Sequence, residues 1–122
     1  MLYQLLIRLD NEKLIKIGSL GNFNFPEGYF IYTGSAKRNF AYRIIRHIRK
    51  KKKYKWHIDY LLKHGRIIQI KKYKSQALSE CNLNRITQKK YKGVDIIKGF
   101  GSSDCKCRSH LLFVGKKFNL IN

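Results

Sequence analysis

The chain has 122 residues, of which 43% are hydrophobic, so it is long and apolar enough for one small domain with a single core. It carries 27 Lys and Arg against 7 Asp and Glu, a formal net charge of +20 at pH 7. This composition excludes a charged, disordered tail. It also excludes a membrane-spanning helix, because no apolar run approaches about 18 residues.

The excess of basic residues predicts a polyanionic partner, and nucleic acid is the partner that the charge favours. So large an excess of positive charge destabilises the folded state, because the basic side chains repel one another. Two alternatives stay open: the lysine bias of an AT-rich genome, and an anionic membrane surface. A thermophile's charged surface is disfavoured because such surfaces balance lysine with glutamate. The membrane surface is disfavoured because no long amphipathic helix stands free to lie on it.

The N-terminus and the cysteines both point to the cytoplasm. Residues 1–9 are apolar but lack a basic lead-in and a small-residue cleavage site, so they predict a core strand and not a signal peptide. The three cysteines, Cys81, Cys105 and Cys107, are odd in number, which favours reduced thiols over disulfides.

Three strands are predicted in the first third of the chain, at residues 2–9, 14–18 and 29–33. The polar turn at residues 10–12 makes the second strand the expected hairpin partner of the first. Residues 21–28 hold two glycines, two asparagines and the only proline, so they are predicted to form a loop.

A basic helix is predicted at residues 39–50. Its expected core-facing arc consists of Phe40, Ala41, Ile44, Ile45 and Ile48. Its opposite arc consists of Arg43, Arg46, His47 and Lys50. Residues 49–53 are five consecutive basic residues, predicted to form a solvated loop over phosphates.

The second half of the chain predicts two more helices and two more strands. A helix at residues 56–63 should bury Ile58, Leu61 and Leu62, and residues 66–73 alternate as a strand does. A helix at residues 75–87 should be capped by Ser75 and face inward through Ala77, Leu78, Cys81 and Ile86. A glycine-serine loop at 99–103 precedes a last strand at 110–114. The expected fold is a single α+β domain over residues 1–122, with a small central mixed or antiparallel sheet flanked by helices.

A site for chemistry on a phosphate is predicted where the strand ending at Tyr32 runs through Gly34 and Ser35 into the basic helix. A tyrosine hydroxyl, a glycine-lined turn and the guanidinium of Arg43 come together there. The order of these residues resembles the GIY-YIG nuclease superfamily, in which two strand tyrosines and a turn glycine precede a helix arginine and a metal-anchoring glutamate. The matching residues are Tyr3, Tyr32, Gly34, Arg43 and Glu80.

The chain also resembles an uncharacterised GIY-YIG-related family over nearly its whole length. The resemblance rests on four segments: residues 34–36 (Gly-Ser-Ala), 56–60 (Trp-His-Ile-Asp-Tyr), 80–81 (Glu-Cys) and 101–107 (Gly-Ser-Ser-Asp-Cys-x-Cys). Some members look fused to DNA-repair glycosylases. The resemblance therefore implies DNA as the preferred nucleic acid and an association with a DNA-repair enzyme.

The resemblance implies a metal-dependent endonuclease acting on DNA phosphodiesters, in which Arg43 pairs with a phosphate oxygen and Glu80 holds Mg²⁺ or Mn²⁺. Tyr3 is expected to be the general base or to position water, with its pKa lowered by nearby cations, and Tyr32 its partner. His47 is expected to contact phosphate or to serve as an auxiliary acid. The expected nucleic-acid-binding residues are Gly34, Ser35, Lys37, Arg38, Arg46 and Lys50. The alternative is a nucleic-acid-binding module of the same fold that has lost the reaction.

A second metal site is possible in the C-terminal part of the chain. Cys81, Cys105, Cys107 and His110 have the donor atoms of a tetrahedral Cys₃His zinc site, although the thiols could equally be small buried apolar groups. Trp56 is predicted to be a core anchor and not a base-stacking platform. His57 and Asp59 are predicted to form a hydrogen-bonded pair at a helix start.

Overall fold

A computed structural model describes residues 1–74, 78–101 and 107–118. Its main sheet has four antiparallel strands in the order β5–β1–β4–β6. The strands are β1 (Leu2–Leu9), β4 (Gly28–Ser35), β5 (Arg66–Tyr73) and β6 (Leu111–Gly115). The predicted α+β fold with a central sheet is confirmed, and the sheet is antiparallel throughout.

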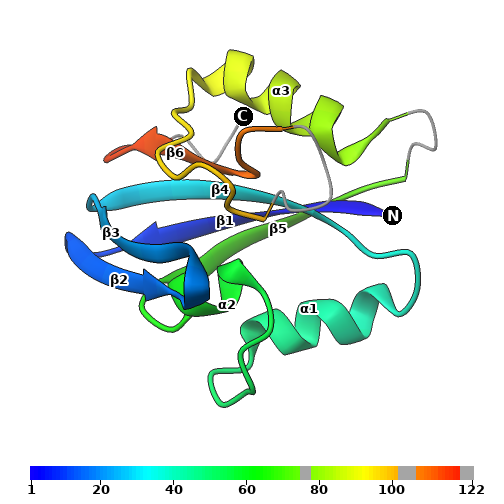
Figure 1. The fold of residues 1–122 in the computed structure, drawn as a ribbon. Helices are drawn as coiled ribbons and strands as arrows, with labels where there is room; N and C mark the ends of the chain where they lie inside the picture. The colour runs from blue at the N-terminus through cyan, green and yellow to red at the C-terminus, as the bar shows by residue number, and fades with distance from the viewer. Residues whose placement is uncertain (75–77, 102–106, 119–122) are drawn as a thin grey trace.

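Three helices cover the two faces of this sheet. They are α1 (Phe40–Ile48), α2 (His57–Leu62) and α3 (Glu80–Tyr91). Helices α1 and α2 lie on one face of the sheet and α3 lies on the other (Figure 1). Among the described residues, none of the helices has the length and apolar character needed to cross a membrane.

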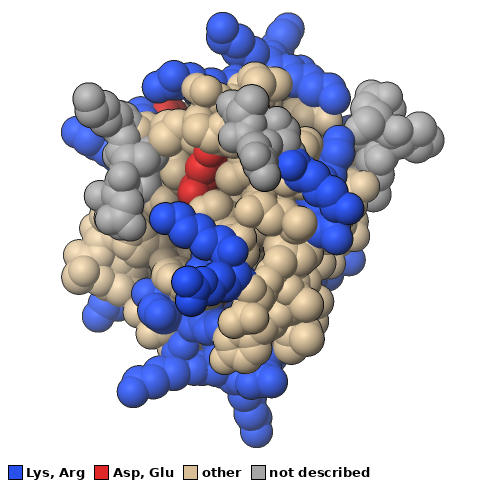
Figure 2. Space-filling model, turned by 90° about the vertical axis from the view of Figure 1, so that its right-hand side faces the viewer, with Lys and Arg blue, Asp and Glu red and all other residues tan. Residues whose placement is uncertain are grey.

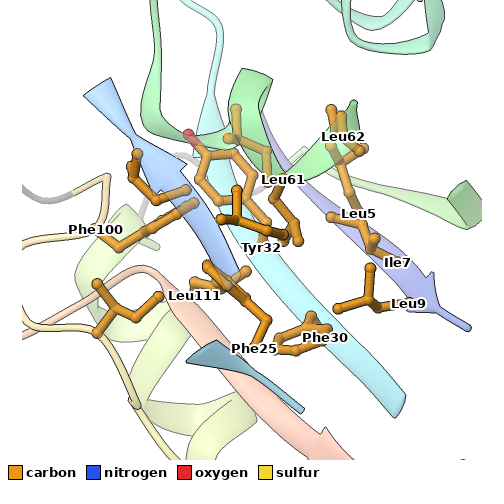
Figure 3. Close-up of a cluster of buried hydrophobic side chains, with 14 of the residues drawn as sticks. Leu5, Ile7, Leu9, Phe25, Phe30, Tyr32, Leu61, Leu62, Phe100 and Leu111 are labelled. Carbon is orange, nitrogen blue, oxygen red and sulfur yellow. The ribbon is translucent and has the colours of Figure 1, made fainter. Parts of the chain in front are cut away.

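The central strand β1 is buried on both faces, which explains its nearly unbroken run of apolar residues. Its side chains alternate between the faces, as they do in any strand. Leu5, Ile7 and Leu9 point into the larger core, beside Phe30 and Leu61 (Figure 3). The opposite side chains of β1 face α3, where the Gln4 amide donates to the hydroxyl of Thr87 over 2.7 Å.

Residues 13–25 differ from the prediction. β2 (Lys13–Ile17) and β3 (Gly21–Phe25) pair with each other as a separate two-stranded sheet, joined by a 3-10 turn at Gly18–Leu20. The predicted pairing of residues 14–18 with β1 is wrong, and so is the predicted loop over residues 21–25. Alternation of exposed and buried side chains explains β3, because Asn22 and Asn24 face solvent while Phe25 is buried in the core.

Helix α1 is rotated from its predicted orientation. Ile45 and Ile48 are each 55% exposed, whereas His47 is only 2% exposed. The predicted apolar arc therefore does not face the core as a unit. Partners at the end of the sheet explain the rotation, because Arg43 and His47 find hydrogen bonds there that offset the cost of burying polar groups.

Helix α3 begins later than predicted. The hydroxyl of Ser79 accepts a hydrogen bond from the backbone N–H of Asn82 over 3.0 Å, so Ser79 is the N-cap. Ser75 and Ala77, the expected cap and one expected core residue, lie outside the described residues. Leu83 faces the sheet, while Ile86 is exposed, so the inward face is also rotated from the prediction.

The basic run at residues 49–53 is only partly solvated. The Lys52 side chain is 5% exposed, and its ammonium donates to the carbonyls of Arg46 and His47 over 3.0 Å each. The ammonium of Lys50 donates to the carbonyls of Leu62 and Gly65. These two lysines satisfy carbonyls at the ends of α1 and α2, so the prediction of a solvated loop is wrong for them, while contact of the run with phosphates stays a prediction.

Candidate functional site

A cleft of about 240 Å³ opens where β4 ends, between α1 and α2 on one side and the start of α3 on the other. Its lining residues are Tyr32, Ser35, Arg43, Lys55, Trp56, His57, Glu80 and Gly101. Tyr32, Arg43 and Glu80 come from a strand and two helices, and they were predicted to share one site. The structure brings these three together, while the fourth, Tyr3, lies beneath the cleft.

Ser35 joins the two sides of the cleft. Its carbonyl oxygen accepts a hydrogen bond from the guanidinium of Arg43 in α1. Its hydroxyl donates to the carboxylate of Glu80, the first residue of α3. A single residue at the end of β4 therefore holds a cation from one face of the sheet near an anion from the other face.

Glu80 is held as a carboxylate. Its side chain is 28% exposed, and its Oε1 lies 2.7 Å from Nδ1 of His110. Burial by itself would raise the pKa of Glu80, but the hydrogen bonds from His110 and Ser35 outweigh it and lower the pKa below its ordinary value. The carboxylate is therefore ionised at neutral pH.

Tyr3 does not line the cleft. It is 1% exposed, and its hydroxyl lies 2.8 Å from Nε2 of His47. Burial raises the pKa of Tyr3 to about 12, although Arg43 acts to lower it through its charge and a hydrogen bond. The expectation that nearby cations give Tyr3 a lowered pKa is wrong, because the desolvation of the phenolate outweighs them.

Tyr32 is the phenol that reaches the cleft. Its ring lies among apolar side chains of the core, with its hydroxyl oxygen at the edge of the cluster (Figure 3). Burial, followed by the charges of Tyr3 and Glu80, raises the pKa of Tyr32 far above its ordinary value. Tyr32 therefore stays protonated and offers a hydroxyl to the cleft.

His47 supports the cleft from below. Burial, followed by the charge of Lys52, lowers the pKa of His47 to about 4, so the imidazole is neutral. The Tyr3 hydroxyl and Nε2 of His47 share one hydrogen bond, so the imidazole is fixed from one side by the phenol. Nδ1 has no hydrogen-bond partner among the described residues. The expected contact of His47 with phosphate is wrong in this structure, since the ring does not reach the surface.

Gly34 makes room for Tyr3. The two residues face each other across the β1–β4 ladder. A Cβ at position 34 would lie 2.7 Å from both Cζ and the hydroxyl oxygen of Tyr3, closer than real Cβ contacts. Gly34 is buried, so its predicted role in binding nucleic acid is replaced by a packing role.

Sequence reasoning missed Lys55 as a cleft residue. Trp56 packs against the core, as predicted, but it also lines the cleft. The guanidinium carbons of Arg43 and Arg46 lie 4.6 and 4.2 Å from the Trp56 ring centroid, so the indole forms a platform for both arginines. Lys55 and Trp56 stand between the basic run at residues 49–53 and the start of α2, and this position was the signal in the sequence.

His57 offers a hydrogen-bond donor to the cleft. Its Nδ1 accepts from the backbone N–H of Gly101 over 2.9 Å, and burial lowers its pKa. The neutral ring therefore carries its proton on Nε2. The predicted pair between His57 and Asp59 is not formed, because the Asp59 carboxylate instead accepts from Arg46 and from two backbone N–H groups.

A basic groove of about 580 Å³ continues from the cleft. Its lining residues are Arg38, Asn39, Tyr42, Arg43, Arg46, Lys53, Tyr54, Lys55 and Trp56. It shares Arg43, Lys55 and Trp56 with the cleft. Figure 2 shows red acidic atoms in a hollow on this side of the molecule, with blue Lys and Arg atoms around it.

The other predicted nucleic-acid-binding residues divide by location. Ser35 lines the cleft and Arg38 lines the groove. Arg46 also lines the groove, but both of its terminal nitrogens lie 2.9 Å from the Asp59 carboxylate. Lys37 is exposed, and Lys50 lies outside both hollows.

A second cluster of donor atoms lies behind Glu80. The ligand atoms of Cys81, Cys107 and His110 all lie within 4.8 Å of one another. Cys105, the other cysteine of the predicted zinc site, lies outside the described residues. The two described thiols are partly exposed and converge on one histidine, which is not how small buried apolar groups are arranged.

The family described as Domain of unknown function DUF123 has a model that matches residues 2–122. The chain belongs to the DUF123 family. No match was found among curated proteins or among solved structures. The DUF123 match includes every residue of the cleft, of the basic groove and of the cluster behind Glu80.

Proposed function

We propose that this DUF123 domain is a divalent-metal-dependent endonuclease that hydrolyses DNA phosphodiester bonds. The observation that supports it most directly is the shared cleft of Tyr32, Arg43 and Glu80. These residues are far apart in the chain, and each has a chemical task in phosphodiester hydrolysis. Their order resembles the GIY-YIG nucleases, and their convergence supports that resemblance.

Arg43 is the phosphate-binding residue in this proposal. Its guanidinium is held by the Ser35 carbonyl and the Tyr3 oxygen, and it lies over the Trp56 ring. A planar guanidinium fixed in this way loses little freedom when it pairs with phosphate oxygens. Lys55 and the Nε2–H of His57 line the same cleft. Together they stabilise the negative charge that develops in the transition state.

Glu80 is the metal ligand in this proposal. It is the acidic side chain among the described cleft residues, it is ionised, and the Ser35 hydroxyl lies beside it. Mg²⁺ is commonly held by one or two carboxylates together with waters and substrate phosphates, and Mn²⁺ accepts the same oxygen donors, so these residues fit such an ion. A bound ion would lower the pKa of a water and neutralise charge on the phosphate.

The two tyrosines have different tasks. Tyr3 is buried with a pKa of about 12, so it acts as a positioning residue that aligns Arg43 and not as the general base. Tyr32 keeps its proton and faces the cleft, where its hydroxyl can orient the attacking water or donate to the leaving oxygen.

The basic groove supplies a path for the DNA strand that leads to the cleft. Its arginines and lysines neutralise phosphates, and its tyrosines offer aromatic faces. Binding that depends on phosphate contacts releases counterions, so we expect affinity to fall steeply with salt. The resemblance to proteins fused to DNA-repair glycosylases favours DNA over RNA and an association with a repair enzyme.

The test is cleavage of plain, branched and damaged duplex DNA by the purified domain with Mg²⁺ or Mn²⁺, and with a chelator as control. Arg43→Ala and Glu80→Gln should each lower the rate by about 10²-fold or more. Arg49→Ala and Glu12→Gln make the same charge changes at exposed positions outside the cleft and should cleave normally.

Two outcomes would overturn the proposal. Cleavage that persists in both Arg43→Ala and Glu80→Gln would mean that the reaction does not occur in this cleft. Tight, salt-dependent DNA binding without cleavage of any substrate would identify a nucleic-acid-binding module instead. The basic groove is the feature that favours this second function, because it needs no catalytic group to bind phosphates.

A further inference from the structure

Three donor groups for a soft metal ion converge beside Glu80. Cys81 follows Glu80 in the first turn of α3, and Cys107 and His110 precede β6. All three donor atoms lie within 4.8 Å of one another. His110 is almost completely buried, so the cluster has one wall in the protein interior and two partly exposed thiols.

The distance between two of these donors is close to that in a tetrahedral zinc site. Zinc–sulfur and zinc–nitrogen bonds of about 2.3 and 2.0 Å place the two ligand atoms about 3.5 Å apart. Cys81 Sγ lies 3.6 Å from His110 Nε2. A thiol–imidazole hydrogen bond would have a similar length, but it would not bring a second sulfur to the same point. The third donor is what favours a metal ion.

The other nitrogen of His110 faces a carboxylate. Nδ1 lies 2.7 Å from Oε1 of Glu80, while Nε2 faces Cys81. Histidines that ligate zinc commonly donate their second N–H to a carboxylate, which fixes the tautomer and the ring orientation. The distance between Nδ1 of His110 and Oε1 of Glu80 is short enough for such a contact.

The backbone holds the histidine in place without help from an ion. The N–H of His110 donates to the Phe100 carbonyl over 2.8 Å, and its carbonyl accepts from the N–H of Thr33 over 3.0 Å. The amide of Asn84 in α3 donates to the carbonyl of Ser109 over 2.7 Å. These bonds tie the segment before β6 to both β4 and α3, so the donor positions are preorganised.

We propose that Cys81, Cys107 and His110 bind a Zn²⁺ ion and that Glu80 orients the histidine ligand. Two thiolates and one imidazole select Zn²⁺ over Mg²⁺ or Mn²⁺, which prefer oxygen donors. The fourth position is taken by water or by a further donor. None of the three ligands lines the cleft of the proposed nuclease, although Glu80 contacts both sites, and zinc binding does not depend on the nuclease activity.

Glu80 then serves two sites. One carboxylate oxygen holds the imidazole of the zinc ligand, and the same side chain lines the cleft and accepts from Ser35. Zinc binding therefore fixes the direction from which the carboxylate enters the cleft. Glu80 is a positioning residue for the zinc site in this arrangement.

The experiment measures metal binding by the full chain, without any nuclease assay. Elemental analysis of the purified protein should give about one zinc per chain. Co²⁺ added to the metal-free protein should produce thiolate-to-cobalt absorption. Cys81→Ser and Cys107→Ser should remove that absorption and most of the zinc, whereas His64→Ala, a histidine outside the cluster, should change neither.

The role of Glu80 is tested by zinc affinity, measured in competition with a chromophoric chelator. Glu80→Gln should weaken zinc binding about 10- to 100-fold, and Glu80→Asp should restore part of it. Unchanged affinity in Glu80→Gln would overturn the orienting role. Circular dichroism identifies variants that do not fold.

A measurement on the wild-type protein keeps the proposal testable if the cysteine variants do not fold. Cys81 and Cys107 should react slowly with a thiol reagent in the zinc-loaded protein and quickly after chelation. Substoichiometric zinc, or thiol reactivity that zinc does not change, would overturn the site. An inactive domain that still binds zinc in this way would refute only the nuclease proposal.

Discussion

The hydroxyl of Tyr3 and Nε2 of His47 form a hydrogen bond of 2.8 Å, in a buried pair beneath Arg43. The histidine is neutral and the phenol keeps its proton, so neither group is poised to exchange protons near pH 7. The pair instead fixes the Tyr3 ring, whose hydroxyl oxygen helps to hold the guanidinium of Arg43. The candidate site therefore has two layers. The buried layer, Tyr3 and His47, supports Arg43, and the cleft residues above it are those that a substrate could contact.

Replacing Tyr3 with Phe should destabilise the protein by about 1–3 kcal/mol, because Nε2 of His47 and an N–H of Arg43 lose a buried partner. Denaturant unfolding measures this change. Cleavage should slow while its pH profile keeps the wild-type shape, since Tyr3 does not titrate in the working range. Tyr91→Phe changes a phenol outside the cleft and the basic groove and should alter neither quantity. A changed pH profile in Tyr3→Phe would restore Tyr3 as the base.

Gly34→Ala should destabilise the protein by about 1–3 kcal/mol, because the new methyl group overlaps the Tyr3 ring. The two residues should also be coupled. In the Tyr3→Leu background, which removes the ring, Gly34→Ala should cost much less. Chemical denaturation of the four proteins of this cycle gives the coupling. Additive effects would show that the close approach of residues 3 and 34 does not constrain the fold.

The lowered pKa of His47 predicts an acid-sensitive stability. The pKa of His47 is about 4 in the folded protein and 6.5 for an ordinary histidine, so the unfolded chain binds the proton more tightly. Stability from this group is complete above about pH 6.5 and is lost as the pH falls toward 4, by about 3 kcal/mol in total. Unfolding free energies of His47→Gln should show a shallower slope in this range. His64→Ala, which changes a less buried ring, should stay close to wild type, and equal slopes for both variants would refute the prediction.

Asp59, which pairs with Arg46, should contribute more to stability than Asp10, which pairs with Arg66. It is fully buried and accepts from Arg46, so Asp59→Asn should cost about 3 kcal/mol at pH 7. Burial raises its pKa, but these hydrogen bonds outweigh that effect and lower the pKa overall. Its stabilisation is present above about pH 4 and is lost as the pH falls through the folded value.

Asp10→Asn is the matched control, because Asp10 pairs with Arg66 at an exposed position. Screened surface pairs contribute little, so its unfolding transition should stay near that of the wild type. Thermal unfolding at pH 7 and at pH 3 compares the two variants. If Asp59→Asn and Asp10→Asn behaved alike, the buried pair would not be holding the segment before α2 in place.

Local patterns were sufficient for much of the fold. The run from Arg66 to Tyr73 has the bounds of β5, and the residues predicted to be buried in α2 are buried. The hairpin at residues 13–25 was missed in part because asparagine and glycine suggested a loop, although Phe25 and its alternating neighbours form a strand. Composition there indicated a loop, whereas alternation indicated a strand. Burial of every second side chain against the core favoured the strand.

The identity of the candidate catalytic residues came from their order in the chain, but their tasks did not. Tyr3 and Tyr32 are both strand tyrosines, and nothing in the sequence separates a buried phenol from one that reaches a cleft. The pKa of each group depends on how much water its neighbours exclude. That quantity is set by contacts between β1, β4 and α1, which are distant in sequence.

The amino-acid sequence by itself determined the fold class, the charge available for a polyanion and the residue types that can bind phosphate or metal. Tertiary structure alone decided that His47 is buried, that Lys50 and Lys52 bind carbonyls, and that Ser35 joins Arg43 to Glu80. The physical reason is that alternation and charge are properties of neighbouring residues. Desolvation and hydrogen bonding between distant segments exist only after the sheet and helices have packed.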